Sequence, residues 1–386
     1  MEKRNIYLDN AATTAVRPEV LEAMLPWFTQ EFGNASSVHA WGRRSQRVVD
    51  ESREKIASLL GAQASEIYFT SGGTEADNWA IKGYATRHRE KGLHLITSAV
   101  EHHAVLHTFD VLKKQGFEVT VLPVDEGGLV EPQSLRDALR PDTILVSVML
   151  ANNEVGAIQP IAELAKIAKE AGAAFHTDAV QAVGHIPINV KELGVDMMTF
   201  SAHKFHGPKG IGALYIRRGV ALDNLMDGGA HERGRRAGTI NHPAIVGMAK
   251  ALELSAGELP EAGIRIAALR DRMIDGILAT VPRSRVNGDR VHRLPGNVNV
   301  SFTGMEGEAL VLSLDMAGIA ASSGSACSSG SLDPSHVLLA MNVPIGSAQS
   351  ALRLTLGEET TQDDVDYTIS KVAEIVERLR AMSPIA

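Results

Sequence analysis

The sequence predicts an α/β protein, in which a large domain with a mostly parallel, helix-covered sheet is joined to a smaller α+β domain. Short apolar runs alternate with helical patterns up to about residue 250, and beyond it this alternation stops. The chain has 386 residues, of which 44% are hydrophobic, so it is long enough for two or three domains. The same composition excludes a disordered chain.

The candidate strands of the large domain are short runs, several of them apolar almost throughout, as expected for strands covered on both faces. They are Glu66–Thr70, His94–Thr97, Glu118–Leu122, Thr143–Met149, Ala174–Asp178, Asp196–Phe200 and Gly212–Ile216. The clearest helix between them is Ile161–Ala171, which has one apolar stripe and lies between Pro160 and Gly172. This alternation predicts a parallel sheet with helices on its faces.

The smaller domain is predicted from mixed strand and helix patterns near the C-terminus. The expected elements are a helix at Glu261–Leu278, a strand at Asn297–Phe302, a helix at Glu306–Met316, a strand at Ala351–Leu356 and a helix capped by Thr361 and Asp364. We therefore expect a large cofactor-binding domain at 15–255. Residues 1–14 and 256–386 would form the small domain, with a Ser/Gly loop at 322–331.

Charge and cysteine content narrow the class of protein. Lys and Arg number 38 against 46 Asp and Glu, a net charge of −8, which disfavours nucleic acid or an anionic membrane as a partner. No apolar run approaches the roughly 18 residues of a membrane span, and charged residues stand where a signal peptide would be apolar. Cys327 is the only cysteine, which excludes an intramolecular disulfide and a multi-cysteine metal site within one chain. We expect a cytoplasmic protein.

A glycine-containing turn, Thr70–Glu75, follows one candidate strand and leads into a helical pattern. Free backbone N–H groups at a helix start suit a phosphate, and the Thr74 hydroxyl adds a donor. The turn lacks the Gly-Lys-Ser/Thr of a Walker loop and the Rossmann glycine spacing. A simple N-capping turn is the alternative interpretation.

Two further residues follow buried strands, namely Asp178 and Lys204. Taken singly, Asp178 is explained as a helix cap and Lys204 as a solvated surface residue. Together with the turn at Thr70–Glu75, they match the needs of pyridoxal 5'-phosphate (PLP). A lysine amine forms its Schiff base, an acid keeps its pyridine nitrogen protonated, and a helix start holds its phosphate.

Seven motifs, which occur in order along essentially the whole chain, resemble those of cysteine desulfurases of the NifS and IscS type. This family lies within the class V aminotransferases, which are fold-type I PLP enzymes. The motifs are Asp9-Asn10-Ala11-Ala12-Thr13-Thr14, Ser71-Gly72-Gly73-Thr74-Glu75, Glu101-His102-His103, Asn152-Asn153-Glu154, Asp178-Ala179-Val180-Gln181, Ser201-Ala202-His203-Lys204 and Ser323-Gly324-Ser325-Ala326-Cys327.

The resemblance implies roles around the cofactor. Lys204 would form the Schiff base, Asp178 would pair with the pyridinium nitrogen, and Gln181 would hydrogen-bond the ring hydroxyl. His102 would stack on the ring and shuttle protons. The residues implied to hold the phosphate are Gly73, Thr74, Ser201 and His203. Thr239 resembles the threonine that reaches the phosphate from the neighbouring subunit, which implies a homodimer.

For the substrate, the resemblance implies that Asn153 contacts cofactor and L-cysteine and that Arg353 binds the substrate carboxylate. The residues alone leave Arg353 open, because an arginine on the exposed face of a strand is the commoner explanation. His103 and His107 have the spacing of a metal-site fragment on a helix, but no third ligand at suitable spacing joins them. We therefore predict no resident metal.

Cys327 lies among small residues at 322–331, a segment that buries little and is expected to be mobile. A small buried thiol in a turn is the alternative, but the large apolar neighbours that this requires are absent. The resemblance implies that Cys327 attacks the sulfur of L-cysteine, leaving L-alanine and a protein persulfide. An iron–sulfur scaffold or another acceptor protein would then take the sulfur, and Cys327 could briefly ligate a nascent cluster.

Two rival functions remain at this stage. An aminotransferase or selenocysteine lyase would share the cofactor residues, although an aminotransferase has no use for Cys327. A catalytically idle homologue would serve only as a sulfur-binding or scaffolding partner. The chain stops at Ser383–Ala386, just after the last expected helix, whereas housekeeping desulfurases extend further with a tail that docks the scaffold. The acceptor therefore stays open, with a slight preference for the nitrogenase-associated kind.

Overall fold

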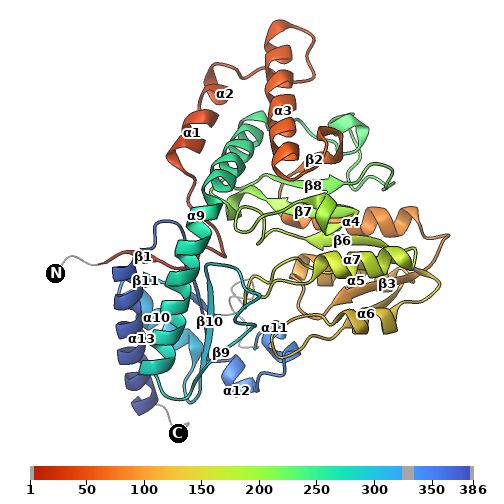
Figure 1. Cartoon of the computed structure of the whole chain (residues 1–386). Helices are drawn as coiled ribbons and strands as arrows, with labels where there is room; N and C mark the ends of the chain where they lie inside the picture. Colours follow the sequence, from red (N-terminus) through yellow and green to blue (C-terminus); the bar gives the residue numbers. More distant parts are fainter. Residues whose placement is uncertain (1–3, 324–333, 383–386) are drawn as a thin grey trace.

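The computed structural model describes residues 4–323 and 334–382 (Figure 1). The predicted nucleophile Cys327 lies outside the described residues. Within them, two parts of the chain are joined by one long helix, and each part has its own sheet.

The large sheet has seven strands in the order β2-β8-β7-β6-β5-β3-β4. Only β8 runs against its neighbours, so the predicted mostly parallel sheet is confirmed. The strands are β2 (Ile67–Thr70), β3 (His94–Ser98), β4 (Glu118–Leu122), β5 (Thr143–Ser147), β6 (Ala174–Asp178), β7 (Met197–Ser201) and β8 (Gly212–Ile216). Three strands match their predicted bounds, whereas β5 ends two residues earlier than the apolar run, because Val148 and Met149 continue it without strand pairing.

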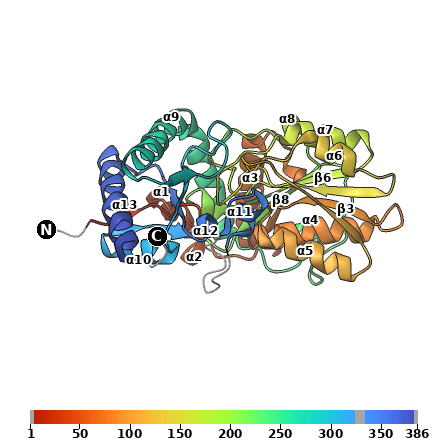
Figure 2. The same ribbon diagram turned by 90° about the horizontal axis from the view of Figure 1, so that it is seen from below.

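Helices cover both faces of this sheet, with α4 and α5 on one side and α6, α7 and α8 on the other (Figure 2). The helices of this part are α1 (Pro18–Met24), α2 (Pro26–Thr29), α3 (Ala40–Leu59), α4 (Gly73–Arg87), α5 (His103–Lys114), α6 (Pro132–Ala138), α7 (Ile161–Glu170) and α8 (Val190–Leu193). Short 3-10 turns are η1 (Ala64–Glu66), η2 (Ala202–Lys204) and η3 (Glu232–Gly234). One apolar core lies under α4 and α5, and a larger one lies on the opposite face.

Helix α9 (His242–Thr280) joins the two parts. The sequence predicted only its second half, Glu261–Leu278, because Pro260 and the neighbouring glycines interrupt the helical pattern. Met248 and Leu252, in the first half, pack into the large core. Met273 and Ile277, in the second half, pack into the core of the smaller part.

The smaller part contains a four-stranded sheet in the order β12-β13-β10-β9 and a short parallel pair, β1 with β11. Its strands are β1 (Ile6–Tyr7), β9 (Ser284–Val286), β10 (Asn297–Phe302), β11 (Ile319–Ala320), β12 (Ser322–Ser323) and β13 (Ala351–Thr355). Its helices are α10 (Gly307–Met316), α11 (His336–Ala340), α12 (Ile345–Ala348) and α13 (Gln362–Met382). Ile6 and Leu8 therefore lie in the same core as residues from the C-terminal third.

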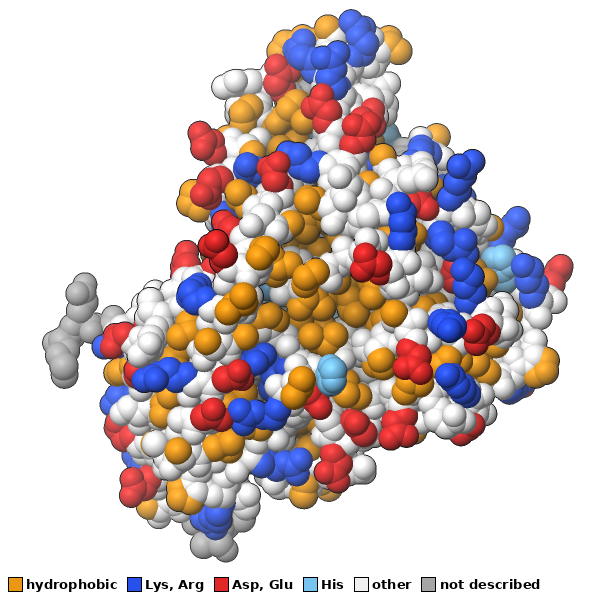
Figure 3. All heavy atoms as spheres, viewed as in Figure 1, with side chains coloured by type: hydrophobic (Ala, Val, Ile, Leu, Met, Phe, Trp, Pro, Cys, Tyr) orange, Lys and Arg blue, Asp and Glu red, His pale blue; other side chains and the backbone are white. Residues whose placement is uncertain are grey.

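Acidic and basic side chains are interspersed on the face shown in Figure 3, and apolar side chains gather over its centre. Among the described residues, no helix combines the length and the apolar character that a membrane crossing requires.

Candidate active site

The carboxyl ends of β2, β6 and β7 lie at the same edge of the large sheet. This arrangement brings the turn before α4, Asp178 and Lys204 to one place, as open α/β sheets do at their ligand sites. A pocket opens at this edge. Its lining combines the turn with residues that follow β7 and with the N-terminal segment: Ala12, Thr13, Ser71, Gly72, Gly73, Thr74, Glu75, Ser201, His203, Lys209 and Gly210.

The turn before α4 is shaped to receive an anion. A Cβ atom on Gly73 would lie 2.7 Å from Val180 Cγ2, so glycine allows the start of α4 to pack closely against the segment after β6. Glu75 accepts a hydrogen bond from the Ser71 amide (2.7 Å), which fixes the turn at the positive end of the α4 dipole. Lys209 adds a positive charge to the same pocket. The N-terminus of this 15-residue helix is therefore a suitable phosphate site.

Ser201 and His203 line the same pocket from the end of β7. The His203 ring contacts the Thr13 hydroxyl through Nδ1 at 3.2 Å. Burial, with the neighbouring charge of Lys204, lowers the pKa of His203 to about 4. The ring is therefore neutral at pH 7 and suited to a hydrogen bond with a phosphate oxygen.

Asp178 is buried at the end of β6, where its Oδ1 accepts a hydrogen bond from the Val180 amide (2.8 Å). Burial raises the pKa of Asp178 to about 6, against the lowering effects of that amide and of Lys204. Asp77 and His176 lie nearby, with His176 Nε2 3.7 Å from Asp77 Oδ1. Asp77 Oδ1 has no hydrogen-bond partner among the described residues, and burial raises the pKa of Asp77 well above its usual value.

Lys204 follows β7 in the turn η2, and its Nζ donates hydrogen bonds to Ala11 O (2.7 Å) and Ala12 O (2.9 Å). Gln181 Nε2 donates to the same Ala11 oxygen at 2.9 Å. The segment that contains Ala11 and Ala12 thus covers the lysine. Reasoning from the sequence gave this segment no role, although its motif was among the seven that carried the resemblance.

Arg353 on β13 is buried, with a side chain only 2% exposed, so the exposed-face interpretation is wrong. Its guanidinium donates to Asn153 O (3.0 Å) and to Asp9 Oδ1 (2.9 Å). Arg353 Nε has no hydrogen-bond partner among the described residues. A buried arginine with an unused donor is well suited to an anionic group such as a substrate carboxylate. Asn153 and Arg353 therefore lie together, as a substrate site requires.

His102 is the N-cap of α5, and its Nδ1 accepts a hydrogen bond from the Ala104 amide (3.1 Å), which leaves the ring proton on Nε2. Burial and the charge of Lys204 lower the pKa of His102 to about 4. The rings of His103 and His107 stack at 5.1 Å, and His336 from α11 lies 4.8 Å from His103. The sequence pattern missed His336, yet the described residues include no group of three or more ligands arranged for a metal ion.

Thr239 is exposed and does not line the pocket within its own chain. The nearby Arg236 forms a bidentate ion pair with Glu75, at 2.7 and 2.9 Å, so this segment is anchored beside the phosphate turn.

Two buried acids were missed as site residues by the sequence reasoning. Glu101 accepts hydrogen bonds from the Ser98 hydroxyl (2.5 Å) and the Met149 amide (2.9 Å), and burial raises its pKa to about 8. Glu154 accepts from the Ser335 hydroxyl (2.5 Å), and burial raises its pKa to about 7. Both lie in motifs of the resemblance, Glu101-His102-His103 and Asn152-Asn153-Glu154, which were the available signal.

These residues fit PLP. The pocket at the start of α4 matches a phosphate, the buried Asp178 matches a ring nitrogen that must stay protonated, and Lys204 lies at the end of the next strand. The unpartnered Nε of Arg353 matches a substrate carboxylate.

A phosphate turn, a buried acid and a lysine at strand ends along one edge of an α/β sheet are typical of PLP-dependent enzymes. The family model for class V aminotransferases matches residues 6–368. The chain therefore belongs to the class V aminotransferase family, in its cysteine desulfurase branch, whose members depend on PLP.

The similar proteins cover nearly the whole chain. The cysteine desulfurase IscS of Methanosarcina thermophila is 56% identical over 384 residues, covering 100% of this chain and 95% of that protein. The cysteine desulfurase IscS of Dictyoglomus turgidum is 54% identical over 382 residues, covering 99% of this chain and 97% of that protein.

Among solved structures, a NifS-like protein has a TM-score of 0.92 and 40% identity, and the match covers 97% of this chain and all of that one. SspA in complex with cysteine has a TM-score of 0.82 and 36% identity, over 92% of this chain and 100% of that one. The expected fold-type I architecture is confirmed.

Proposed function

We propose that the chain is a PLP-dependent cysteine desulfurase that converts L-cysteine to L-alanine and passes the sulfur on as a persulfide on Cys327. The observation that carries the proposal is the meeting of the phosphate turn, Asp178 and Lys204 at one sheet edge. Lys204 and the buried Arg353 both contact the same N-terminal segment, at Ala11–Ala12 and at Asp9. The full-length relatives named cysteine desulfurase IscS support this function over an aminotransferase or selenocysteine lyase.

The residues proposed to hold PLP are Gly73, Thr74, Ser201 and His203 at the phosphate, Asp178 at the ring nitrogen, Gln181 at the ring hydroxyl and Lys204 at the aldehyde carbon. When bound, PLP supplies an electron-withdrawing ring that labilises the bonds around the substrate Cα and Cβ.

The chain's own side chains then have separate tasks. Arg353 and Asn153 orient the carboxylate of L-cysteine, and the Lys204 amine moves a proton at the substrate Cα. His102, which is neutral and carries its proton on Nε2, is placed to move a second proton near the cofactor ring.

Sulfur transfer is assigned to Cys327. Its thiolate forms a bond to the substrate sulfur while the substrate Cβ–S bond breaks. The electron pair of that bond stays with the carbon skeleton, which gains a proton and leaves as L-alanine. The sum is L-cysteine plus a thiol giving L-alanine plus a persulfide, with no external oxidant. An iron–sulfur scaffold or another acceptor then takes the terminal sulfur.

We also propose a homodimer, with Thr239 reaching the partner's phosphate site. Large apolar side chains on and around α1–α3 support it, because they are about half exposed: Leu21 49%, Leu25 55%, Phe28 55%, Phe32 60% and Trp41 43%. We further propose two domains, 15–255 and 1–14 with 256–386. The core that Ile6 and Leu8 share with residues 266–376 supports this division, while Val337 and Leu338 of α11 pack into the large core. A cytoplasmic location fits a reactive thiol, which the cytosol keeps reduced.

The test is peptide mapping after two treatments of the purified protein. Borohydride reduction should leave pyridoxyl on the peptide that contains Lys204. Exposure to L-cysteine should add about 32 Da, one sulfur atom, to the peptide that contains Cys327. Cys327→Ser should keep the visible absorption of bound PLP and release no sulfide. A keto-acid product without alanine, or wild-type sulfide release by Cys327→Ser, would overturn the proposal.

A further inference from the structure

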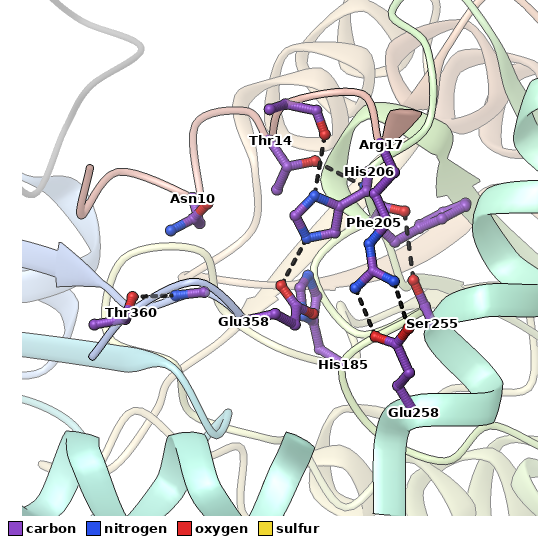
Figure 4. A network of polar contacts seen from close by, with 12 residues as sticks. Asn10, Thr14, Arg17, His185, Phe205, His206, Ser255, Glu258, Glu358 and Thr360 are labelled. Atoms are coloured by element: carbon purple, nitrogen blue, oxygen red, sulfur yellow. Dashed lines mark hydrogen bonds and ion pairs between the residues drawn. The ribbon is translucent and has the colours of Figure 1, made fainter. Parts of the chain in front are cut away.

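Every backbone carbonyl oxygen of residues 203–206, the segment that carries Lys204, is hydrogen-bonded to another element, and Figure 4 shows the surroundings of Phe205 and His206. Thr14 donates to His203 O from both its amide and its hydroxyl (3.0 Å each), and the same hydroxyl accepts from the His206 amide at 2.8 Å. His185 Nε2 lies 2.8 Å from Lys204 O. The Arg17 amide donates to His206 O at 3.3 Å. We call residues 11–17, which supply most of these contacts, the strap.

His206 has its ring between two hydrogen-bond acceptors. Nδ1 lies 3.0 Å from the carbonyl oxygen of Ala15, and Nε2 lies 2.7 Å from Glu358 Oε2. Neither acceptor can donate, so both ring nitrogens must carry hydrogen and the ring is an imidazolium. The side chains of His206 and Glu358 are only 12% and 20% exposed, so this ion pair is largely shielded from water.

Glu358 belongs to the smaller part of the chain, in the turn after β13. Arg265 on α9 donates to the backbone oxygens of Glu358 and, at 2.9 Å, of Thr360, which holds this turn in place. The pair His206–Glu358 therefore joins the segment that carries Lys204 to the smaller part, while the Ala15 contact joins it to the strap.

We propose that His206 is a positioning residue for Lys204, which fixes the strap and the turn after β13 against residues 203–206 only while its ring is charged. The proposal deepens the proposed function and rests on it for the role of Lys204. The neighbouring Arg17 does not compete with His206 for Glu358, because its guanidinium is bound by Glu258 through two 2.7 Å contacts.

The pH range in which His206 is charged follows from the groups around its ring. Burial lowers the pKa of His206, but the hydrogen bond and charge of Glu358 outweigh it, so the pKa is raised above 6.5. Arg17 acts in the lowering direction, and burial lowers the pKa of His185, which keeps that neighbour neutral at pH 7. Glu358 has a pKa lowered to about 2 and stays charged throughout. A raised histidine pKa stabilises the folded state below about pH 6.5 and loses this contribution as pH rises through the folded value.

The experiment compares four full-length proteins: wild type, Glu358→Gln, His206→Asn and the control Asp366→Asn. Asn tolerates the φ of +64° at position 206, so backbone strain does not confound that variant. Asp366→Asn serves as a control because it also removes an ion pair, that with Arg272, which is exposed and involves no residue of the strap. Two readouts are taken at pH 6 and pH 9: amide hydrogen-exchange protection of peptides 11–17 and 203–206, and the rate at which PLP leaves the holoenzyme.

In wild type and Asp366→Asn, protection of both peptides should fall, and PLP release should accelerate, by about tenfold between pH 6 and pH 9, the effect of one charge-assisted hydrogen bond. Glu358→Gln and His206→Asn should match the wild-type pH 9 values at both pH values. Wild-type protection in either variant, or a loss that does not depend on pH in wild type, would overturn the positioning role. A wild type that never takes PLP on Lys204 but shows the protection pattern would instead overturn the proposed function.

Discussion

The floor and the rim of this site are built in different ways. The floor consists of Asp178, Asp77, His176 and Glu101, which are almost completely buried around the large sheet. The rim consists of Lys204, Arg353 and the N-terminal residues that they contact. These residues are far apart in the chain: Lys204 is 193 positions from Ala11, and Arg353 is 344 positions from Asp9. Burial determines which floor side chains carry a proton, whereas contacts between distant segments determine how the rim side chains are oriented. Substitutions in the floor should therefore change the chemical step, and substitutions in the rim should change substrate binding.

The largest effect is expected at the floor, for Asp178→Asn. An amide cannot supply the negative charge proposed to hold a proton on the cofactor ring, so kcat should fall by roughly 10²–10³ while KM changes little. Steady-state alanine formation measures both constants. Asp142→Asn, an exposed carboxylate near the start of β5, serves as control and should stay close to wild type. If Asp178→Asn kept most of the wild-type kcat, Asp178 would have no role in the chemical step.

The rim is tested by Arg353→Lys. Lysine keeps the charge but loses the planar fork that contacts Asn153 and Asp9, so KM for L-cysteine should rise about tenfold to a hundredfold, with a smaller change in kcat. The same kinetic assay applies, with Arg272→Lys as the surface control. An effect confined to kcat would show that Arg353 acts on the chemical step. Floor and rim would then not differ in the kinetic constant that they control.

A smaller effect is expected for Glu101→Gln, in the pH dependence of the free energy of unfolding. The pKa of Glu101 is raised to about 8, so the folded state keeps a proton that the unfolded chain loses above about pH 4.5. Wild type therefore loses stability between pH 4.5 and pH 8, and the glutamine variant lacks this loss. Relative to wild type, Glu101→Gln should gain about 2 kcal/mol in free energy of unfolding from pH 5 to pH 6.5. Urea unfolding at both pH values measures it, and parallel pH dependences would contradict it.

The smallest effect is expected away from both regions, for Thr361→Ala at the start of α13. Thr361 and Asp364 form a reciprocal cap, with the Thr361 amide donating to Asp364 Oδ2 (3.0 Å) and the Asp364 amide to Thr361 Oγ1 (3.2 Å). Its loss should cost about 1 kcal/mol of unfolding free energy and leave kcat and KM unchanged. Thr361→Ser keeps the hydroxyl and should behave as wild type in denaturant unfolding. Altered KM in Thr361→Ala would show that the cap influences the rim.

Asp178 and Lys204 could be predicted from the sequence, whereas the other floor residues and the contacts of the rim could not, for a physical reason. Asp178 ends β6 as predicted, because an apolar run followed by a polar residue is a local pattern. The carbonyl groups that receive Lys204, the burial of Arg353 and the contact of His336 with His103 depend on segments far apart in sequence. The hydrophobic periodicity of the sequence contains no information on which distant residues contact each other. Only the resemblance pointed to Asp9–Thr14 and Arg353, and it gave the former no role.

Helix α9 contributes its first half to one core and its second half to the other. Neither core can lose its order without removing a packing surface from a helix on which the other depends. Heating should therefore melt both parts together in one cooperative calorimetric transition, although each part has apolar packing of its own.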